Sequence, residues 1–344
     1  MKTLLTSFFS LLLLLAFHAA PAQTIRRCNN VGVTGAGIFA TLQAAHDAAA
    51  SNDIIYLEPS GISYGSLVCV KPLTILGNGY LHGEQAPPLT VDPRASVVDD
   101  ITFRAGSEGA RLAGISTNSR VMINANNITV ERNSVGGSGI NLGADEFITG
   151  TQVAVTTGLI RQNFINADLT FRPSSSSTIA GVLISNNLIL GNITGGNSNR
   201  VNSVLIANNV LGNRAGTGSG SIDVDNCVLK NNIVTRATAT FALRANASSN
   251  NLGTGTQFGT ANGNQQNVAL GSIFGSATGT ETAFQIAVGG PADNTGESGV
   301  DCGAFGAATP YVLTGLPNVP TIFEYSQSIS GATLNATIST RSNK

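Results

Sequence analysis

Hydrophobic residues along most of this chain come in short runs separated by turns that contain Gly, Ser or Asn. Residues 54–57, 67–70 and 73–75 are early examples, and each run is rich in Ile, Leu or Val. Short aliphatic runs bounded by turn formers predict short strands. Residues 41–51 differ, because their apolar positions recur at helical spacing; we expect a helix there, with Thr41 as its N-cap.

The strand pattern repeats along the middle of the chain. Five segments share an apolar run, one or two polar residues, an Asn and usually two more apolar residues: 128–135, 158–165, 182–189, 204–211 and 227–234. The shared asparagines are Asn133, Asn163, Asn187, Asn209 and Asn232, with Asn251 as a sixth. Their separations are 30, 24, 22, 23 and 19 residues. This period is typical of one coil of a parallel β-helix, in which a coil holds three short strands and three turns.

Aligned on the Asn, the segments predict which side chains face inward. Three positions earlier an aliphatic column is expected inside: Val130, Ile160, Ile184, Ile206 and Leu229. Two positions earlier an outward column is expected: Glu131, Arg161, Ser185, Ala207 and Lys230. Stacked coils lie about 4.8 Å apart, so each Asn amide can donate to the next coil and accept from the previous one. We therefore expect a ladder of asparagines, each at a sharp turn with unusual backbone angles.

Other segments carry a resemblance to a known group of proteins. These are the helix at 40–50 leading into 53–59, the segment 71–77, the Asn-containing coils and the closing segment 299–306. With them the chain resembles the right-handed parallel β-helix (pectin-lyase-like) superfamily, and more closely uncharacterised exported bacterial β-helix proteins. The resemblance implies the fold but no single activity, since the superfamily includes lyases, hydrolases and adhesins.

The chain divides into four parts. Lys2, an apolar run at 4–17 and Ala20-Pro21-Ala22 predict a secretory signal peptide at 1–22, so we expect a soluble product, secreted or held in the cell envelope. Residues 23–52 should form an N-terminal strand and a capping helix, and residues 53–309 the all-β parallel β-helix. Residues 310–344 are rich in turn formers and Ser/Thr, and should form an extended segment that closes the last coils.

The composition limits the kinds of partner that the protein can bind. Lys and Arg number 18 and Asp and Glu 19, together only 11% of the chain, so there is no basic stripe for nucleic acid. No run after the signal peptide is long enough to span a membrane. Of the four cysteines, Cys227 continues an inward column and should be buried and unpaired, while Cys28 with Cys69 is the bridge to expect if one forms. We expect a monomer.

Candidate chemistry is sparse. Asp223 and Asp225 would both point outward from one strand and could bind calcium weakly; the alternative is a solvated pair. The only histidines after the signal peptide, His46 and His82, suggest no metal cluster or triad, and we nominate no catalytic residue and no other cofactor. The sequence thus favours a secreted scaffold, structural or glycan-binding, with a polysaccharide or cell-surface glycan as partner. The alternative is a polysaccharide lyase or glycoside hydrolase of the same superfamily.

Overall fold

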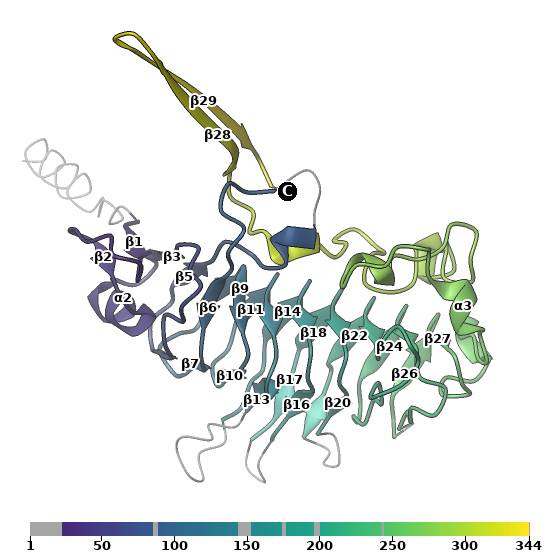
Figure 1. Ribbon diagram of the computed structural model, residues 1–344. Coiled ribbons are helices and arrows are strands. Elements are labelled where there is room, and N and C mark those ends of the chain that lie inside the picture. Colours follow the sequence, from purple (N-terminus) through teal and green to yellow (C-terminus); the bar gives the residue numbers. More distant parts are fainter. Residues whose placement is uncertain are drawn as a thin grey trace, which may run out of the picture.

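A computed structural model describes residues 23–84, 89–143, 153–173, 177–195, 200–242 and 244–343. The expected signal peptide, residues 1–22, lies outside them. The described chain is all-β, and most of its strands form three long parallel sheets (Figure 1). Successive strands of the chain pass from sheet to sheet, so that β11, β12 and β13 lie in three different sheets and β14, β15 and β16 follow them one step along the stack. This is the arrangement of a parallel solenoid.

The first sheet has eleven strands, in the order β2 (Ile38–Phe39), β1 (Ile25–Cys28), β3 (Ile54–Leu57), β5 (Thr74–Leu76), β8 (Arg111–Ala113), β11 (Ile128–Glu131), β14 (Gly158–Arg161), β18 (Val182–Ser185), β22 (Leu205–Ala207), β24 (Val228–Lys230) and β26 (Ala247–Ser249). The second has six: β20 (Ile193–Thr194), β16 (Leu169–Phe171), β13 (Gly139–Leu142), β10 (Arg120–Ile123), β7 (Ile101–Phe103) and β4 (Leu67–Cys69). The third has eight: β27 (Leu252–Gly253), β25 (Ile233–Val234), β23 (Val210–Leu211), β19 (Leu188–Ile189), β15 (Phe164–Ile165), β12 (Ser134–Val135), β9 (Ile115–Thr117) and β6 (Ser96–Val98).

The remaining elements are short, apart from one hairpin. Two strands pair beside the main sheets, β17 (Ile179–Ala180) and β21 (Val201–Asn202). Among the described residues the α-helices are α2 (Leu42–Ala48) and α3 (Leu270–Ile273), and the 3₁₀ turns are η1 (His82–Glu84), η2 (Ala261–Gly263), η3 (Thr282–Phe284), η4 (Glu297–Gly299) and η5 (Leu313–Gly315). An antiparallel hairpin, β28 (Thr321–Ser330) and β29 (Thr333–Arg341), projects from the stack (Figure 1).

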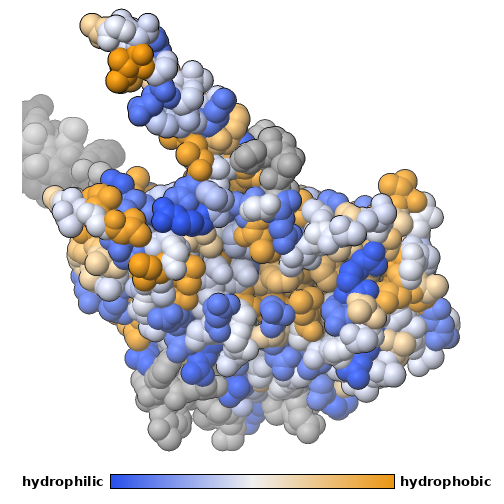
Figure 2. All heavy atoms as spheres, in the orientation of Figure 1, coloured by the Kyte–Doolittle hydropathy of each residue, from blue (hydrophilic) through white to orange (hydrophobic). Residues whose placement is uncertain are grey.

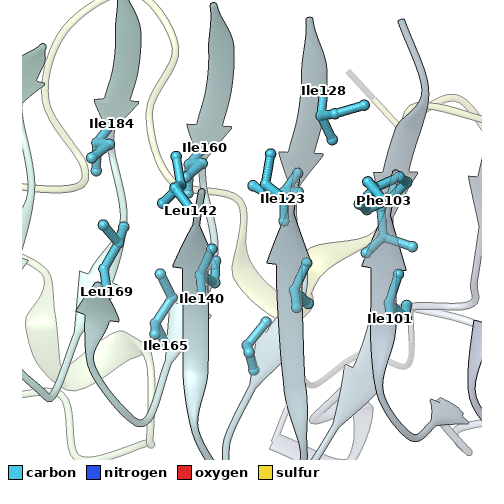
Figure 3. Packing of buried hydrophobic residues seen from close by; sticks show 14 of the residues in the cluster. Ile101, Phe103, Ile123, Ile128, Ile140, Leu142, Ile160, Ile165, Leu169 and Ile184 are labelled. Carbon is cyan, nitrogen blue, oxygen red and sulfur yellow. The ribbon is translucent and has the colours of Figure 1, made fainter. Parts of the chain in front are cut away.

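The three sheets enclose one continuous aliphatic core. The inward column expected from the sequence, including Ile160 and Ile184, is fully buried. It packs with inward residues of the second sheet, such as Leu142 and Leu169, and of the third, such as Ile165 (Figure 3). Strand alternation places every second side chain in this core, and stacking repeats the placement coil after coil.

At the first coils, α2 lies against β1, β2, β3 and β4. Thr41 caps it through a side-chain bond to the amide of Ala44, but the helix ends at Ala48 and not at the expected Ser51, because Ala49 is extended. Lys71 Nζ binds the carbonyls of His46 and Ala49, both at 2.8 Å, and so takes up free carbonyls at the helix end.

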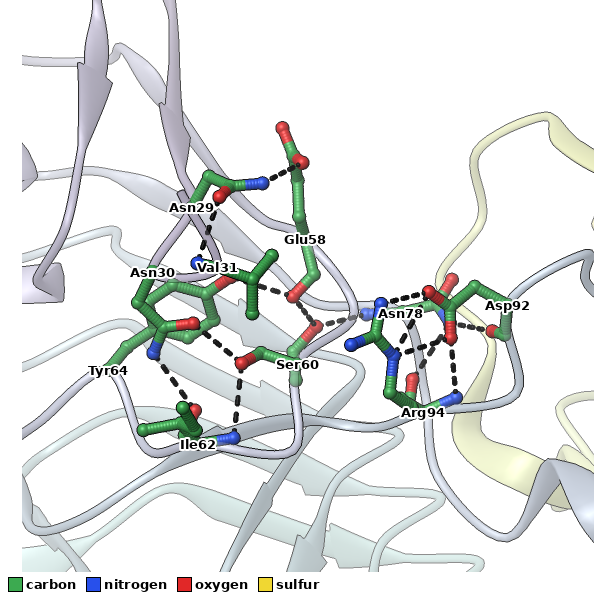
Figure 4. A network of polar contacts seen from close by, with 11 residues as sticks. Asn29, Asn30, Val31, Glu58, Ser60, Ile62, Tyr64, Asn78, Asp92 and Arg94 are labelled. Carbon is green, nitrogen blue, oxygen red and sulfur yellow. Dashed lines mark hydrogen bonds and ion pairs between the residues drawn. The ribbon is translucent and has the colours of Figure 1, made fainter. Parts of the chain in front are cut away.

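Polar side chains fix the long turns beside these strands (Figure 4). Asn30 donates to the carbonyl of Ile62 at 3.0 Å and accepts from Ser60 Oγ at 2.6 Å. Tyr64, which is fully buried, donates its hydroxyl proton to the carbonyl of Glu58 at 3.0 Å. Backbone groups that leave the sheets here are thus paired with side chains, as buried polar groups require.

The asparagines form a ladder through the interior of one turn. Each Nδ2 donates to the Oδ1 of the next Asn at 2.9–3.1 Å, from Asn133 through Asn163, Asn187, Asn209 and Asn232 to Asn251. Each Nδ2 also donates to a carbonyl of the previous coil, for example that of Ile160 from Asn187 at 3.0 Å. All six side chains are fully buried. The ladder continues to Asn264, which accepts from Asn251 Nδ2 at 3.1 Å.

The unusual backbone angles belong to the residue before each ladder Asn, not to the Asn itself as expected. These six residues, here called the clamp column, have φ between 53° and 57°: Arg132, Gln162, Asn186, Asn208, Asn231 and Asn250. Asn tolerates the left-handed region well, whereas Arg and Gln do so at a cost of order 1–3 kcal/mol. The ladder Asn follows this bend and can therefore point inward, where its amide meets the next coil.

The clamp column holds the chain that follows the last coil against the stack. Residues 268–316 are here called the C-terminal segment. The side chains of the clamp column bind the backbone of this segment in reverse order along the stack. Asn250 Nδ2 donates to the carbonyl of Thr295, Asn208 Nδ2 to that of Asp301, Asn186 Nδ2 to that of Gly306, Gln162 Nε2 to that of Pro310 and Arg132 Nη1 to that of Leu316, at 2.6–3.3 Å. The C-terminal segment thus runs back along the coils toward the N-terminal end (Figure 1).

This segment also covers the outer face of the eight-stranded sheet. Outward residues of that sheet, such as Leu188, Val210 and Ile233, form a second buried core with Phe274 and Phe284. The coils were expected to extend to residue 309 and the closing segment to begin at 310. The last strand of the three sheets is β27, and residues from Val268 onward already pack over the outer face of the eight-stranded sheet.

The four cysteines are all buried and free. Cys227 is unpaired in the core, as the sequence predicts, and burial raises the pKa of its thiol to about 12. Cys28 and Cys69 form no bridge.

A buried carboxyl joins the C-terminal segment to the stack. Glu281 is only 1% exposed; it accepts from the Tyr311 hydroxyl and, at 2.7 Å, from the amide of Thr314. Tyr311 and Tyr80 of the stack have their hydroxyl oxygens 2.9 Å apart. Burial raises the pKa of Glu281 to about 7, because removal from water disfavours the charged form.

Stability should therefore fall as pH rises toward neutrality. The folded protein keeps a proton on Glu281 that the unfolded chain releases above the ordinary pKa of 4.5. The contribution of this group is complete below pH 4.5 and is lost as pH rises through about 7. We expect the Glu281 contribution to the free energy of unfolding to fall by up to about 1.4 kcal/mol per pH unit in this window. Urea unfolding of the wild type and of Glu281→Gln at several pH values tests this; the wild-type profile should fall relative to that of the variant, and equal slopes would contradict the prediction.

Candidate functional site

The acidic pair singled out from the sequence is occupied by an arginine. Ile222 and Val224 are buried, and Asp223 and Asp225 lie between and beside them. The Arg244 guanidinium binds both carboxylates, through Nη2 to Asp223 and Nε to Asp225. The hydrogen bonds to Asp225 and Asp223 raise the pKa of Arg244. A calcium ion would have to displace this arginine, and two carboxylates supply few of the oxygen ligands it needs.

Other polar chemistry is equally dispersed. No group of three or more His, Cys, Asp or Glu residues is close enough to hold a metal in the part of the chain that the structure describes. His46 is buried and accepts the amide proton of Val70 on Nε2 at 3.1 Å, and His82 is buried in η1 with Nε2 2.6 Å from the Asn78 carbonyl. Both histidines thus have structural contacts.

The outer face of the eleven-stranded sheet is the better candidate. The strand registers place four aliphatic residues in one row over four successive coils: Leu159, Leu183, Leu205 and Val228. The three leucines are half-buried, and Val228 is 41% exposed. This aliphatic row points away from the core. In Figure 2, hydrophobic surface gathers over the middle and later coils of the visible face.

A second outward row, which carries the polar and charged side chains of this face, runs beside the aliphatic row. It is the outward column expected from the sequence, and the registers place its members side by side in successive coils: Glu131, Arg161, Ser185, Ala207 and Lys230. Lys230 Nζ lies 2.5 Å from Glu297 of the C-terminal segment. The C-terminal segment therefore borders the sheet face on the side of this row.

Glu131 lies at the N-terminal end of the row and is held by two arginines. Arg111 Nε and Arg161 Nε are both 2.6 Å from its carboxylate oxygens. Although expected to point to solvent, Glu131 is only 2% exposed, because it lies between these arginines. Burial alone would raise the pKa of the Glu131 carboxyl, but the two arginines outweigh burial and lower it. The three residues together carry one net positive charge.

A small pocket lies where this row meets the C-terminal segment. It has a volume of about 200 Å³, and its lining includes Arg132, Arg161 and Gln162 from two coils and residues 308–310 and Val312 from the C-terminal segment. Arg132 Nε donates to Gln162 Oε1 at 3.0 Å, so both side chains are fixed. The pocket offers hydrogen-bond donors and an apolar wall, which suits a small polar group with apolar faces.

Sequence reasoning identified the outward column. It missed the pairing of Arg244 with the two aspartates, the ion pairs of Arg111 and Arg161 with Glu131, and the pocket. Arg244 lies 19 residues after Asp225, close to one coil period, so alignment by coil would have placed the two side by side. The pocket left no such signal, because half of its wall comes from residues 308–312, which are about 150 residues away in sequence from Gln162.

Comparison with known proteins gives no relative. No family model, no curated protein and no solved structure matches the chain. Among the residues that the structure describes, no helix is long and apolar enough to cross a membrane.

Proposed function

We propose that this protein is an exported scaffold of the right-handed parallel β-helix type that binds an extended polysaccharide on the outer face of its eleven-stranded sheet. The pectin-lyase-like resemblance of the sequence and the expected signal peptide support the superfamily and the export. The place of α2 beside the first strands supports its role as an N-terminal cap. The observation that supports a polysaccharide as the ligand is the pair of parallel rows, one aliphatic and one with polar and charged side chains, over successive coils.

A polysaccharide matches such a pair of rows. Each sugar ring has apolar C–H faces and hydroxyl edges, and a chain of rings repeats both along its length. The aliphatic row from Leu159 to Val228 can contact C–H faces, while Arg161 and Lys230, which are partly exposed, can bind hydroxyl groups. Aromatic stacking has less support as the basis of binding, because Tyr64 and Tyr80 are buried.

Binding without cleavage is favoured over lyase or hydrolase chemistry. Proton abstraction next to a uronic carboxylate needs a base close to a neutralising cation. Arg111 and Arg161 lie close together, but both are paired with Glu131. Arg161 and Lys230 are separated along the outward column by the coils of Ser185 and Ala207, about 14 Å in all. The carboxylates of Asp223 and Asp225 are paired with Arg244, and the neighbouring Ile222 pairs with Ile193 of the six-stranded sheet. These distances support a scaffold.

Binding to immobilised neutral and acidic polysaccharides tests the proposal. We expect one class to bind the purified protein, and Leu183→Asp to weaken that binding at least tenfold, because a charge in the aliphatic row would have to be desolvated against C–H groups. The matched control is Thr194→Asp, a half-buried position on the six-stranded sheet, which should bind like the wild type. Equal thermal unfolding of the two variants checks that both fold.

Three results would contradict the proposal. The first is that no polysaccharide of the panel binds. The second is that Leu183→Asp binds as well as Thr194→Asp. The third is the accumulation of unsaturated or reducing-end products with the wild-type protein, which would favour the lyase or hydrolase alternative.

A further inference from the structure

The projecting hairpin has one wholly uncharged, largely apolar face. Its register places three cross-strand pairs on this face: Tyr325 opposite Ile338, Gln327 opposite Ala336 and Ile329 opposite Leu334. The other face has Ser326 opposite Thr337, Ser328 opposite Asn335 and Glu324 opposite Ser339. The strands therefore separate apolar from polar side chains, as strands do when one side is to be covered.

Nothing in the described part of this chain covers the apolar face. Tyr325 is 50% exposed, Ile338 58%, Leu334 62% and Ile329 79%. The hairpin is tied to the rest of the chain near its base, where Arg341 Nη2 donates to the carbonyl of Leu89 at 2.9 Å. Beyond the base it extends clear of the stack, with hydrophobic residues along it (Figures 1 and 2). A two-stranded hairpin alone is marginally stable in water, and exposed apolar faces of this kind mark interaction sites.

We propose that this face is a self-association surface, on which the hairpins of two copies pack face to face. The face is uncharged, so two copies meet without repulsion. It is also symmetric along its length, with a large apolar pair on either side of the Gln327–Ala336 pair. A two-fold axis through this middle pair brings the Tyr325–Ile338 pair of one copy over the Ile329–Leu334 pair of the other, which is an isologous contact.

The size of the face sets the strength of the contact. Four large side chains per copy, each at least half exposed, bury on the order of 500 Å² per copy and 1,000 Å² in the pair. This is at the lower end of specific interfaces, so we expect a dimer that dissociates in the micromolar range. The monomer expected from the sequence is then the dilute form. The contact is independent of the polysaccharide, since it uses none of the sheet face.

Sedimentation of the purified protein between about 1 and 100 µM tests the proposal. We expect a concentration-dependent dimer that the double variant Ile329→Ser, Leu334→Ser weakens at least tenfold. The matched control, Ser328→Ala with Asn335→Ser, changes the polar face at neighbouring positions and should dimerise like the wild type. A protein that stays monomeric throughout this range, or a dimer equally strong in the Ile329→Ser, Leu334→Ser variant, would overturn the proposal.

A cross-link adds a test of the geometry. Gln327→Cys places a thiol at the proposed axis, so oxidation should join two copies, whereas Ser326→Cys on the polar face should not. The native cysteines do not interfere, because all four are buried. Equal cross-linking of the two variants would contradict the face-to-face arrangement.

Discussion

Replacing Ile184 with Ala is expected to lower the free energy of unfolding by about 3–4 kcal/mol, whereas the same change at the neighbouring Leu183 should cost less than about 1 kcal/mol. Ile184 is fully buried between three sheets, so its loss removes apolar contacts and leaves a cavity. Leu183 lies next to it in β18 but faces outward. Urea unfolding of both variants measures the difference.

This pair is a matched comparison within one strand. Similar losses at the two positions would mean that the register of the eleven-stranded sheet is different from the one described. A larger loss at Leu183 would exclude the aliphatic row as an accessible binding surface.

Replacing Asn209 with Ala should lower the free energy of unfolding by about 3 kcal/mol, since several buried polar groups lose their partner at once. Asn209 Oδ1 accepts from both the backbone and side-chain nitrogens of Asn187, each at 3.0 Å. Its Nδ2 donates to the carbonyl of Ile184 and to Asn232 Oδ1, also at 3.0 Å. Chemical denaturation again provides the measurement.

Asn202→Ala is the control for this substitution, because Asn202 lies in the short strand β21 and is half-buried. It should cost less than about 1 kcal/mol. If Asn209→Ala costs no more than Asn202→Ala, the ladder does not join the coils as the hydrogen bonds indicate.

The repeating part of the fold could be predicted from the sequence because stacked coils need the same kind of residue at the same position in each coil. One aliphatic position, such as Ile184, proves little alone, but five at a fixed offset from an Asn select a single register. The ladder follows from the same alignment. Asn264 escaped it because it comes only 13 residues after Asn251, and this last interval is shorter than any other in the ladder.

The bend beside the ladder was misplaced by one residue for a chemical reason. Asn is the residue expected at positive φ, so the repeated Asn seemed the natural position. In one coil, however, the residue with positive φ is Arg132, and in the next it is Gln162. Their side chains donate hydrogen bonds to the carbonyls of Leu316 and Pro310 of the C-terminal segment.

The C-terminal part of the chain was the least accessible from sequence. The clamp column is made of Arg, Gln and Asn, and it binds backbone carbonyls, which carry no sequence signature. The alternation in residues 321–341 is visible in the sequence, but the absence of a cover on its apolar face depends on where the hairpin points, which only the tertiary structure gives. The aliphatic row and its pocket likewise depend on packing between distant segments.

Hydrogen exchange of asparagine side-chain amides, followed by NMR, tests the coil stacking most directly. The Nδ2 protons of Asn187, Asn209 and Asn232 are fully buried and bonded on both sides, so they should exchange orders of magnitude more slowly than those of Asn335 on the exposed hairpin. Slow exchange at all three in the wild type, and faster exchange at Asn187 and Asn232 in Asn209→Ala, is the result that the ladder predicts. Exchange of these amides as fast as that of Asn335 would contradict it.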